Sequence, residues 1–135
     1  MYRASFRAAS LTGLLWVSFC TPVVAAPESP DGSNIGFVLY TKSPAPGTLN
    51  ARWMYSTKYS GPGIATGGPK SGFVGNYHVR YFYDSGEFSD EYDLVIAKIG
   101  DIYKVSWMAN GKVQATGVGM EVENGLAVGW RRGVD

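Results

Sequence analysis

Two Asn-Gly dipeptides constrain the fold of this chain more than any other feature. Asn110-Gly111 and Asn124-Gly125 each separate two segments in which apolar and polar residues alternate. Asn and Gly tolerate the positive backbone angles of tight hairpin turns, and alternation is typical of a strand with one buried face. Such short connections join antiparallel strands, because a parallel crossover needs a dozen or more residues. The sequence therefore predicts consecutive antiparallel hairpins.

The strand pattern covers most of the chain. Seven segments are rich in Val, Ile, Tyr and Trp and are bounded by Gly, Asn, Asp or Pro, which predicts strands. They span residues 35–41, 48–55, 73–83, 91–98, 102–108, 112–120 and 126–132. Short returns connect the later segments, so residues 73–132 form a predicted meander. No window has apolar residues at helical spacing over enough length to compete with this interpretation.

The alternation also separates an apolar face from a polar face. The predicted apolar face comprises Leu49, Ala51, Trp53, Tyr55, Phe73, Tyr77, Val79, Tyr81, Tyr83, Tyr92, Leu94, Ile96, Tyr103, Val105, Trp107, Val113, Ala115, Gly117, Leu126, Val128 and Trp130. A two-faced meander must bury its apolar side and protect its edges, and closure into a barrel does both. We therefore predict an all-β, antiparallel up-and-down barrel of seven or eight strands, with a β-sandwich as the alternative.

An eighth strand is the open alternative in that prediction. It would have to come from residues 56–72, whose Gly and Pro content argues against a regular central strand. We interpret this segment as a long loop that is either a lid or binding loop or a simple crossing of the barrel end. Within it, residues 63–71 approach a phosphate-loop pattern, but Pro69 interrupts the pattern and no predicted helix follows.

The N-terminus is typical of a bacterial secretory signal. Arg3 and Arg7 precede a short apolar core, and small residues ending at Ala26 suit cleavage there. The core is too short for a transmembrane helix. Cys20 follows Phe19 rather than a small residue, which favours a non-lipidated product.

These features divide the chain into three parts. Residues 1–26 are the predicted signal peptide, residues 27–33 a flexible segment, and residues 34–135 a single barrel domain. We expect an exported protein, periplasmic or secreted, with no membrane span in the mature chain.

Composition excludes several function classes. The chain has 12 basic and 11 acidic residues, which indicates no nucleic-acid partner. Its one cysteine lies in the predicted leader, so the mature chain has no disulfide and no thiol nucleophile. His78 is the one histidine, which leaves no metal constellation and no nucleophilic triad. The acidic hairpin at 84–93 lacks the spacing of a calcium loop and is interpreted as a solvated hairpin. We expect no metal and no cofactor.

The predicted interior holds more Tyr and Trp than a dry core accommodates. Each buried O–H or N–H needs a partner, so some of these side chains should lie where the barrel opens. Aromatic faces with a few hydroxyls are the usual lining of a small-molecule site. The candidate ligand-binding residues are Trp53, Tyr55, Tyr77, Tyr81, Tyr83, Tyr103, Trp107 and Trp130. The alternative is that the tyrosines straddle the barrel ends with wet hydroxyls and bind nothing.

A resemblance supports the same picture. The leader, the meander, the interior aromatics and the ending GLAVGWRRG at 125–133 resemble small exported bacterial barrels of the avidin and lipocalin type. The chain departs from a lipocalin-like Gly-x-Trp opening, because it has Ala51-Arg52-Trp53, and an avidin-like set of biotin ligands does not map onto it. The resemblance implies a barrel with a pocket at one end and no particular ligand.

Three function classes follow. The first is an exported non-catalytic module that binds a small, partly apolar ligand at the barrel mouth. The second is a protein- or glycan-interaction domain, for example an inhibitor, that uses the 56–72 loop and exposed tyrosines. The third is an enzyme, although the sequence places no catalytic pair. A ligand-sized cavity would favour the first class, a filled core with an exposed aromatic patch the second, and a buried carboxylate beside the mouth the third. Oligomeric state is not predicted.

Overall fold

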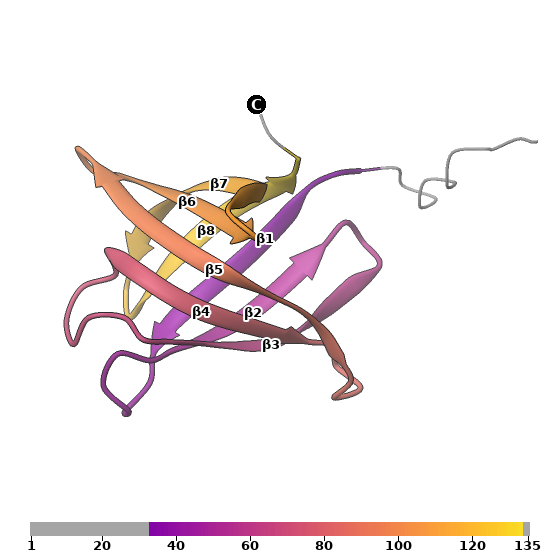
Figure 1. The fold of residues 1–135 in the computed structure, drawn as a ribbon, viewed down its shortest axis with the longest axis horizontal. Coiled ribbons are helices and arrows are strands. Elements are labelled where there is room, and N and C mark those ends of the chain that lie inside the picture. The colour runs from indigo at the N-terminus through magenta and orange to yellow at the C-terminus, as the bar shows by residue number, and fades with distance from the viewer. Residues whose placement is uncertain (1–32, 134–135) are drawn as a thin grey trace, which may run out of the picture. The chain divides into compact units, whose positions relative to one another are not determined.

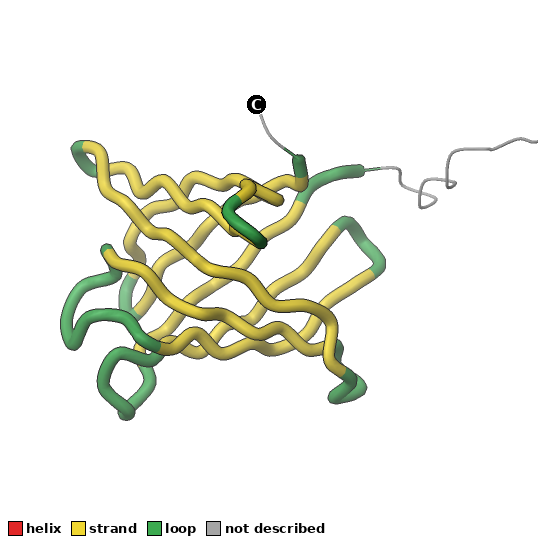
Figure 2. Tube along the Cα trace, viewed as in Figure 1, coloured by secondary structure: helices red, strands yellow, loops and turns green. Residues whose placement is uncertain are grey.

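A computed structural model describes residues 33–133 of the chain. The predicted signal peptide (1–26), and all of the predicted flexible segment (27–33) except Ser33, lie outside the described residues. Figure 2 shows the described part as strands and loops. In residues 33–133, no helix has the length and apolar character needed to cross a membrane.

Eight strands form a closed antiparallel barrel (Figure 1). They are β1 (Gly36–Lys42), β2 (Leu49–Tyr55), β3 (Tyr59–Thr66), β4 (Gly75–Phe82), β5 (Phe88–Ile99), β6 (Ile102–Ala109), β7 (Lys112–Val122) and β8 (Gly125–Arg132). Each strand pairs with the next along the chain, and β1 pairs with β8. The predicted up-and-down barrel is confirmed, with eight strands rather than seven.

The two Asn-Gly sequences form different turns. Asn110 and Gly111 both have positive φ, 53° and 76°, as a two-residue hairpin turn with mirror-image geometry requires. At the second site Asn124 has φ 65°, but Gly125 already pairs with Val122 as the first residue of β8. A Cβ on Gly125 would lie 2.8 Å from the Tyr40 carbonyl oxygen, so close packing against β1 explains this glycine. The predicted turn there is shifted by one residue.

Strand β3 corrects the interpretation of residues 56–72 as one long loop. Its glycines allow close approach rather than breaking the strand: a Cβ on Gly61 would meet the Phe82 carbonyl oxygen, and one on Gly63 would meet the Tyr81 ring. Pro62 pairs with Arg52 of β2, and the ladder between β3 and β4 begins only at Gly63. A proline is tolerated there because no β4 residue pairs with it and needs its missing N–H. Gly and Pro therefore mark a gap beside β4 and not the end of the strand.

The two ends of the barrel differ. The end that we call the mouth carries the β2–β3, β4–β5 and β6–β7 hairpins, and the opposite end, the base, carries the loops at 43–48 and 67–74. Figure 1 shows these two loops on the left and the β2–β3 and β4–β5 hairpins on the right. At the base, Phe73 packs edge-on against Tyr103 with ring centroids 6.5 Å apart, and the Tyr77 hydroxyl donates to the Phe73 carbonyl at 2.9 Å. Phe73 therefore plugs the base from within the 67–74 loop.

The buried core runs through the middle of the barrel. Its fully buried side chains are Tyr40, Leu49, Leu94, Ile96, Leu126, Val38, Val79, Val105 and Val128. Register shifts occur between Tyr81 and Phe82 in β4 and between Trp107 and Met108 in β6. Both irregularities lie toward the mouth, where bulges commonly re-aim side chains.

Candidate functional site

A cavity of about 240 Å³ lies at the mouth. Every strand contributes to its wall, and eight of the lining residues are aromatic. The lining consists of Val38, Trp53, Tyr55, Tyr59, Tyr81, Tyr83, Ser89, Asp90, Tyr92, Trp107, Ala115, Trp130 and Arg132. The site is therefore mainly aromatic, with a small polar group on one side.

Six of the eight candidate residues line this cavity: Trp53, Tyr55, Tyr81, Tyr83, Trp107 and Trp130. The other two, Tyr77 and Tyr103, point into the barrel but lie at the base. There the Tyr77 hydroxyl donates to a backbone carbonyl, and the Tyr103 hydroxyl donates to Glu121 at 2.9 Å. Alternation along a strand predicts which face a side chain occupies but not how deep it lies. The sequence pattern therefore does not distinguish candidate residues at the mouth from those at the base.

The aromatic wall is built from rings in mutual contact. Tyr55 and Trp130 are stacked, with centroids 5.0 Å apart and an interplanar angle of 14°. Trp130 also contacts Trp107 at 6.0 Å, and Trp53 contacts Tyr83 at 5.9 Å. Each ring restrains its neighbours, so the wall keeps its shape without needing a ligand to organise it.

Polar atoms of the wall are tied back to the barrel. The Trp53 Nε1–H donates to the carbonyls of Phe82 (3.0 Å) and Pro62 (3.2 Å), across the gap between β3 and β4. The Tyr55 hydroxyl donates to Asn34 Oδ1 at 2.9 Å. The same Asn34 side chain bonds both backbone groups of Arg132, which fixes the seam between β1 and β8 at the rim.

The floor of the cavity is a buried hydrogen-bonded group. The Trp107 Nε1–H donates to the Tyr81 hydroxyl oxygen at 2.7 Å, and the hydroxyls of Tyr81 and Tyr40 lie 2.6 Å apart. Tyr40 is fully buried and Tyr81 is 6% exposed. Burial raises the pKa of both phenols well above the ordinary value, so both stay protonated at neutral pH.

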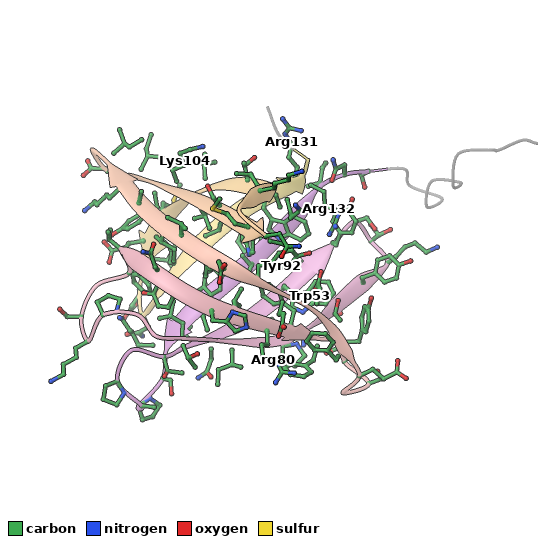
Figure 3. All side chains as sticks on the ribbon, viewed as in Figure 1. Trp53, Arg80, Tyr92, Lys104, Arg131 and Arg132 are labelled. Carbon is green, nitrogen blue, oxygen red and sulfur yellow. The ribbon has the colours of Figure 1, made fainter. Side chains whose placement is uncertain are left out.

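The polar side of the cavity contains Asp90, Tyr92 and Arg132. The Tyr92 hydroxyl donates to Asp90 Oδ2 at 2.5 Å. Burial raises the pKa of Tyr92, and Asp90 raises it further, while the hydrogen bond and charge of Arg132 oppose the rise. In Figure 3 Arg132 and Tyr92 lie next to each other above Trp53, and all three residues line the same cavity.

Asp90 and Arg132 are site residues that sequence reasoning missed. Asp90 lies two positions before Tyr92, and Arg132 lies two positions after Trp130. Each therefore continues an inward-facing row by one step, and extending the alternation past its last apolar member would have found both. The acidic residues at 84–93 were instead interpreted as a solvated hairpin, which is wrong for Asp90. In residues 33–133, no three His, Cys, Asp or Glu side chains cluster in a way that could hold a metal ion.

Comparisons of this chain with models of protein families, with curated proteins and with solved structures found no match. The chemistry of the mouth cavity is therefore the basis on which a function is assigned.

Proposed function

We propose that this chain is an exported, non-catalytic binding module of the avidin and lipocalin architectural type, whose mouth cavity holds a small, partly apolar ligand. The observation that carries the proposal is the aromatic cavity itself, lined from all eight strands. Small-molecule sites occupy roughly 300–1,000 Å³, so a cavity of about 240 Å³ suits a ligand that is small or partly exposed at the rim.

The chemistry of the lining supports a ligand with an apolar body. Stacked rings offer large, rigid apolar faces at little cost in conformational entropy, because their orientations are already fixed by their neighbours. Ser89, Asp90 and Arg132 lie together with these rings in the lining and supply both charge signs for a polar end. A ligand that is polar throughout would leave the aromatic wall unmatched.

The test is a ligand panel on the purified protein. Aromatic molecules of one or two rings are titrated while tryptophan emission and melting temperature are followed. A ligand at about 100 times its Kd raises the unfolding free energy by about 2.7 kcal/mol. For a domain of this size, that raises the melting temperature by roughly 10–20 °C. A panel that changes neither emission nor melting temperature would contradict the proposal.

Two matched variants locate the binding. Trp130→Leu removes a ring from the mouth, and Phe73→Leu removes a ring from the base. We expect Trp130→Leu to weaken a ligand found in the panel by tenfold or more, and Phe73→Leu to leave its affinity within about twofold. Equal losses in the two variants would place the ligand elsewhere.

The interaction-domain alternative loses part of its basis, because residues 59–66 form a strand and leave a short β2–β3 connection. The enzyme alternative has one observation in its favour, the half-buried Asp90 carboxylate in the cavity. Asp90 is the one carboxylate in the lining, and its Oδ2 accepts from Tyr92. Catalysis by a pair of carboxylates would need a second carboxylate, which this lining does not supply.

Export is the remaining part of the proposal. The leader-like sequence supports cleavage after Ala26. Mass spectrometry of the exported protein should give a chain that begins at Pro27. A mature chain that starts at Met1, or at a lipidated Cys20, would overturn this part.

A further inference from the structure

At the cavity floor, the hydrogen bonds between protein groups use all but one of the available donor protons. Three donors meet there: the O–H groups of Tyr40 and Tyr81 and the N–H of Trp107. The Trp107 bond uses one donor, and the bond between the two hydroxyls uses a second. The third proton belongs either to Tyr40 or to Tyr81, depending on which hydroxyl donates to the other.

The surroundings of the two hydroxyls decide between these arrangements. If Tyr81 donated to Tyr40, the Tyr40 proton would need another acceptor. Tyr40 has no exposed surface, and in the described barrel Tyr81 is the one acceptor near its hydroxyl, because the neighbouring Trp107 indole can only donate. A buried donor without an acceptor costs about 1–3 kcal/mol. Tyr40 therefore donates to Tyr81, whose oxygen accepts from Tyr40 and Trp107 together.

This assignment turns the Tyr81 proton toward the cavity. Tyr81 lines the cavity, whereas Tyr40 does not. The Tyr81 side chain is 94% buried (6% exposed), so an acceptor must reach its proton through the mouth. In the described barrel no hydrogen bond joins Tyr81 to Asp90, and Oδ2 of that carboxylate accepts from Tyr92. The floor of the cavity is thus a hydrogen-bond donor at the end of an aromatic wall.

Charge near the floor restricts the acceptor. Asp90 is the register partner of Tyr81 on the neighbouring strand, and both residues line the cavity. The negative charge of Asp90 contributes to the raised pKa of Tyr81, after burial, and it penalises an anionic ligand group at the same place. A carboxylate or phosphate would also lose its hydration at the floor. A neutral carbonyl oxygen carries only a partial charge, so both penalties are much smaller for it.

We propose that the Tyr81 hydroxyl donates a hydrogen bond to the ligand and selects neutral aromatic compounds that carry a carbonyl oxygen at their inner end. The ring system of such a compound lies against Trp53, Trp107 and Trp130, and its carbonyl reaches the floor. This inference rests on the proposed binding function and narrows it to one chemical class.

The experiment compares three probes of the same shape. Acetylnaphthalene carries the ketone, ethylnaphthalene replaces its carbonyl by a methylene, and naphthoate replaces it by an anionic group. Affinities are measured by isothermal titration calorimetry with the wild type, Tyr81→Phe and the control Tyr77→Phe. Tyr77 is the matched control because its hydroxyl donates to a backbone carbonyl at the base.

We expect the preference for the ketone over the ethyl compound to fall about tenfold in Tyr81→Phe, the loss of one buried hydrogen bond. In Tyr77→Phe, the preference for the ketone over the ethyl compound should stay within about twofold of the wild-type value. Naphthoate should bind the wild type more weakly than the ketone. The carbonyl stretching band of bound acetylnaphthalene should move to lower wavenumber in the wild type and not in Tyr81→Phe. Even if Tyr81→Phe folds poorly, a wild-type band at the position of a ketone without a hydrogen bond would overturn the proposal.

The outcomes separate the two proposals. If the naphthyl probes bind but the preference is the same in wild type and Tyr81→Phe, with no band shift, the donor assignment is wrong and the binding function stands. Preferred binding of naphthoate would also overturn it, since Arg132 would then select the ligand. If none of the three probes binds the wild type, and the wider panel fails as well, both proposals fail.

Discussion

Replacing Gly36 by alanine should disturb the mouth through one ring. Gly36 of β1 pairs with Trp130 of β8, and both face the interior. A Cβ on Gly36 would lie 2.0 Å from Cε2 and 2.3 Å from Cζ2 of the Trp130 indole. Because real contacts of this kind are well above 3 Å, the indole must leave its position against Tyr55, where the rings stack at 5.0 Å.

The size of the effect follows from where the ring can go. Inserting a methyl group into a packed core costs about 1–3 kcal/mol. Trp130 is only partly buried and borders the cavity, so it can rotate into that space, and we expect the lower end, about 1 kcal/mol. This corresponds to a fall in melting temperature of roughly 4–8 °C. A displaced indole also occupies the cavity, so the loss of binding free energy for a panel ligand should exceed the loss of unfolding free energy.

Gly129→Ala is the matched control. Gly129 also lies on β8 and pairs with β1, but an added Cβ there meets no atom within 4 Å, and its φ lies outside the left-handed region. Its unfolding free energy should change by less than about 0.5 kcal/mol. The assay is urea denaturation followed by tryptophan emission, together with titration of a panel ligand. If Gly36→Ala is as mild as Gly129→Ala in both measurements, the reasoning about the indole is refuted.

Three further predictions test the turns and the titrating groups. Gly111→Val should destabilise by about 1 kcal/mol or more in urea denaturation, since its φ of 76° disfavours a β-branched residue; an unchanged midpoint would argue against the tight turn. Tyr40 and Tyr81 have raised pKa values in the folded barrel, so their contribution to the unfolding free energy is complete below about pH 10. Above that pH the unfolding free energy should fall by about 1.4 kcal/mol per pH unit for each phenol. An unfolding free energy of the wild type that stays constant above that pH would contradict the burial of these phenols. The hydrogen bond from Arg52 lowers the pKa of Asp84, so any stabilisation is present above about pH 4 and lost as the pH falls through the folded-state value; melting curves of wild type and Asp84→Asn should converge in acid, and a difference that grows there would refute the link.

The barrel was predictable because alternation and short turns are local features. Tyr103, Val105 and Trp107 alternate with polar neighbours, and the structure places all three inside with little or no exposed surface. Closure followed from the need to bury one face of a meander and protect its edges. These inferences required no knowledge of which residues touch across the barrel.

The depth of each residue and the path of β3 depend on contacts between distant segments. Tyr77 and Tyr81 share one face of β4, yet Tyr77 lies at the base and Tyr81 at the cavity floor. What separates them is the plug formed by Phe73, which comes from a loop whose position the sequence pattern does not specify. In the same way, Gly61 argues against a strand when the sequence is considered alone. The structure shows instead that the Phe82 carbonyl lies where a Cβ at this position would be.

The floor and the wall of the cavity are held by different means, and this difference explains how an aromatic mouth keeps its shape. The rings of the wall direct their polar atoms outward: the indole N–H of Trp53 bonds to backbone carbonyls, and the hydroxyl of Tyr55 bonds to Asn34. Their faces remain available to a ligand at no further cost of ordering. At the floor the bonds run inward from Tyr40 and Trp107 to Tyr81, which concentrates the polar character of the deep end in one hydroxyl. In the binding mode that we propose, the ligand meets apolar surface along the wall and a single directed proton at its inner end.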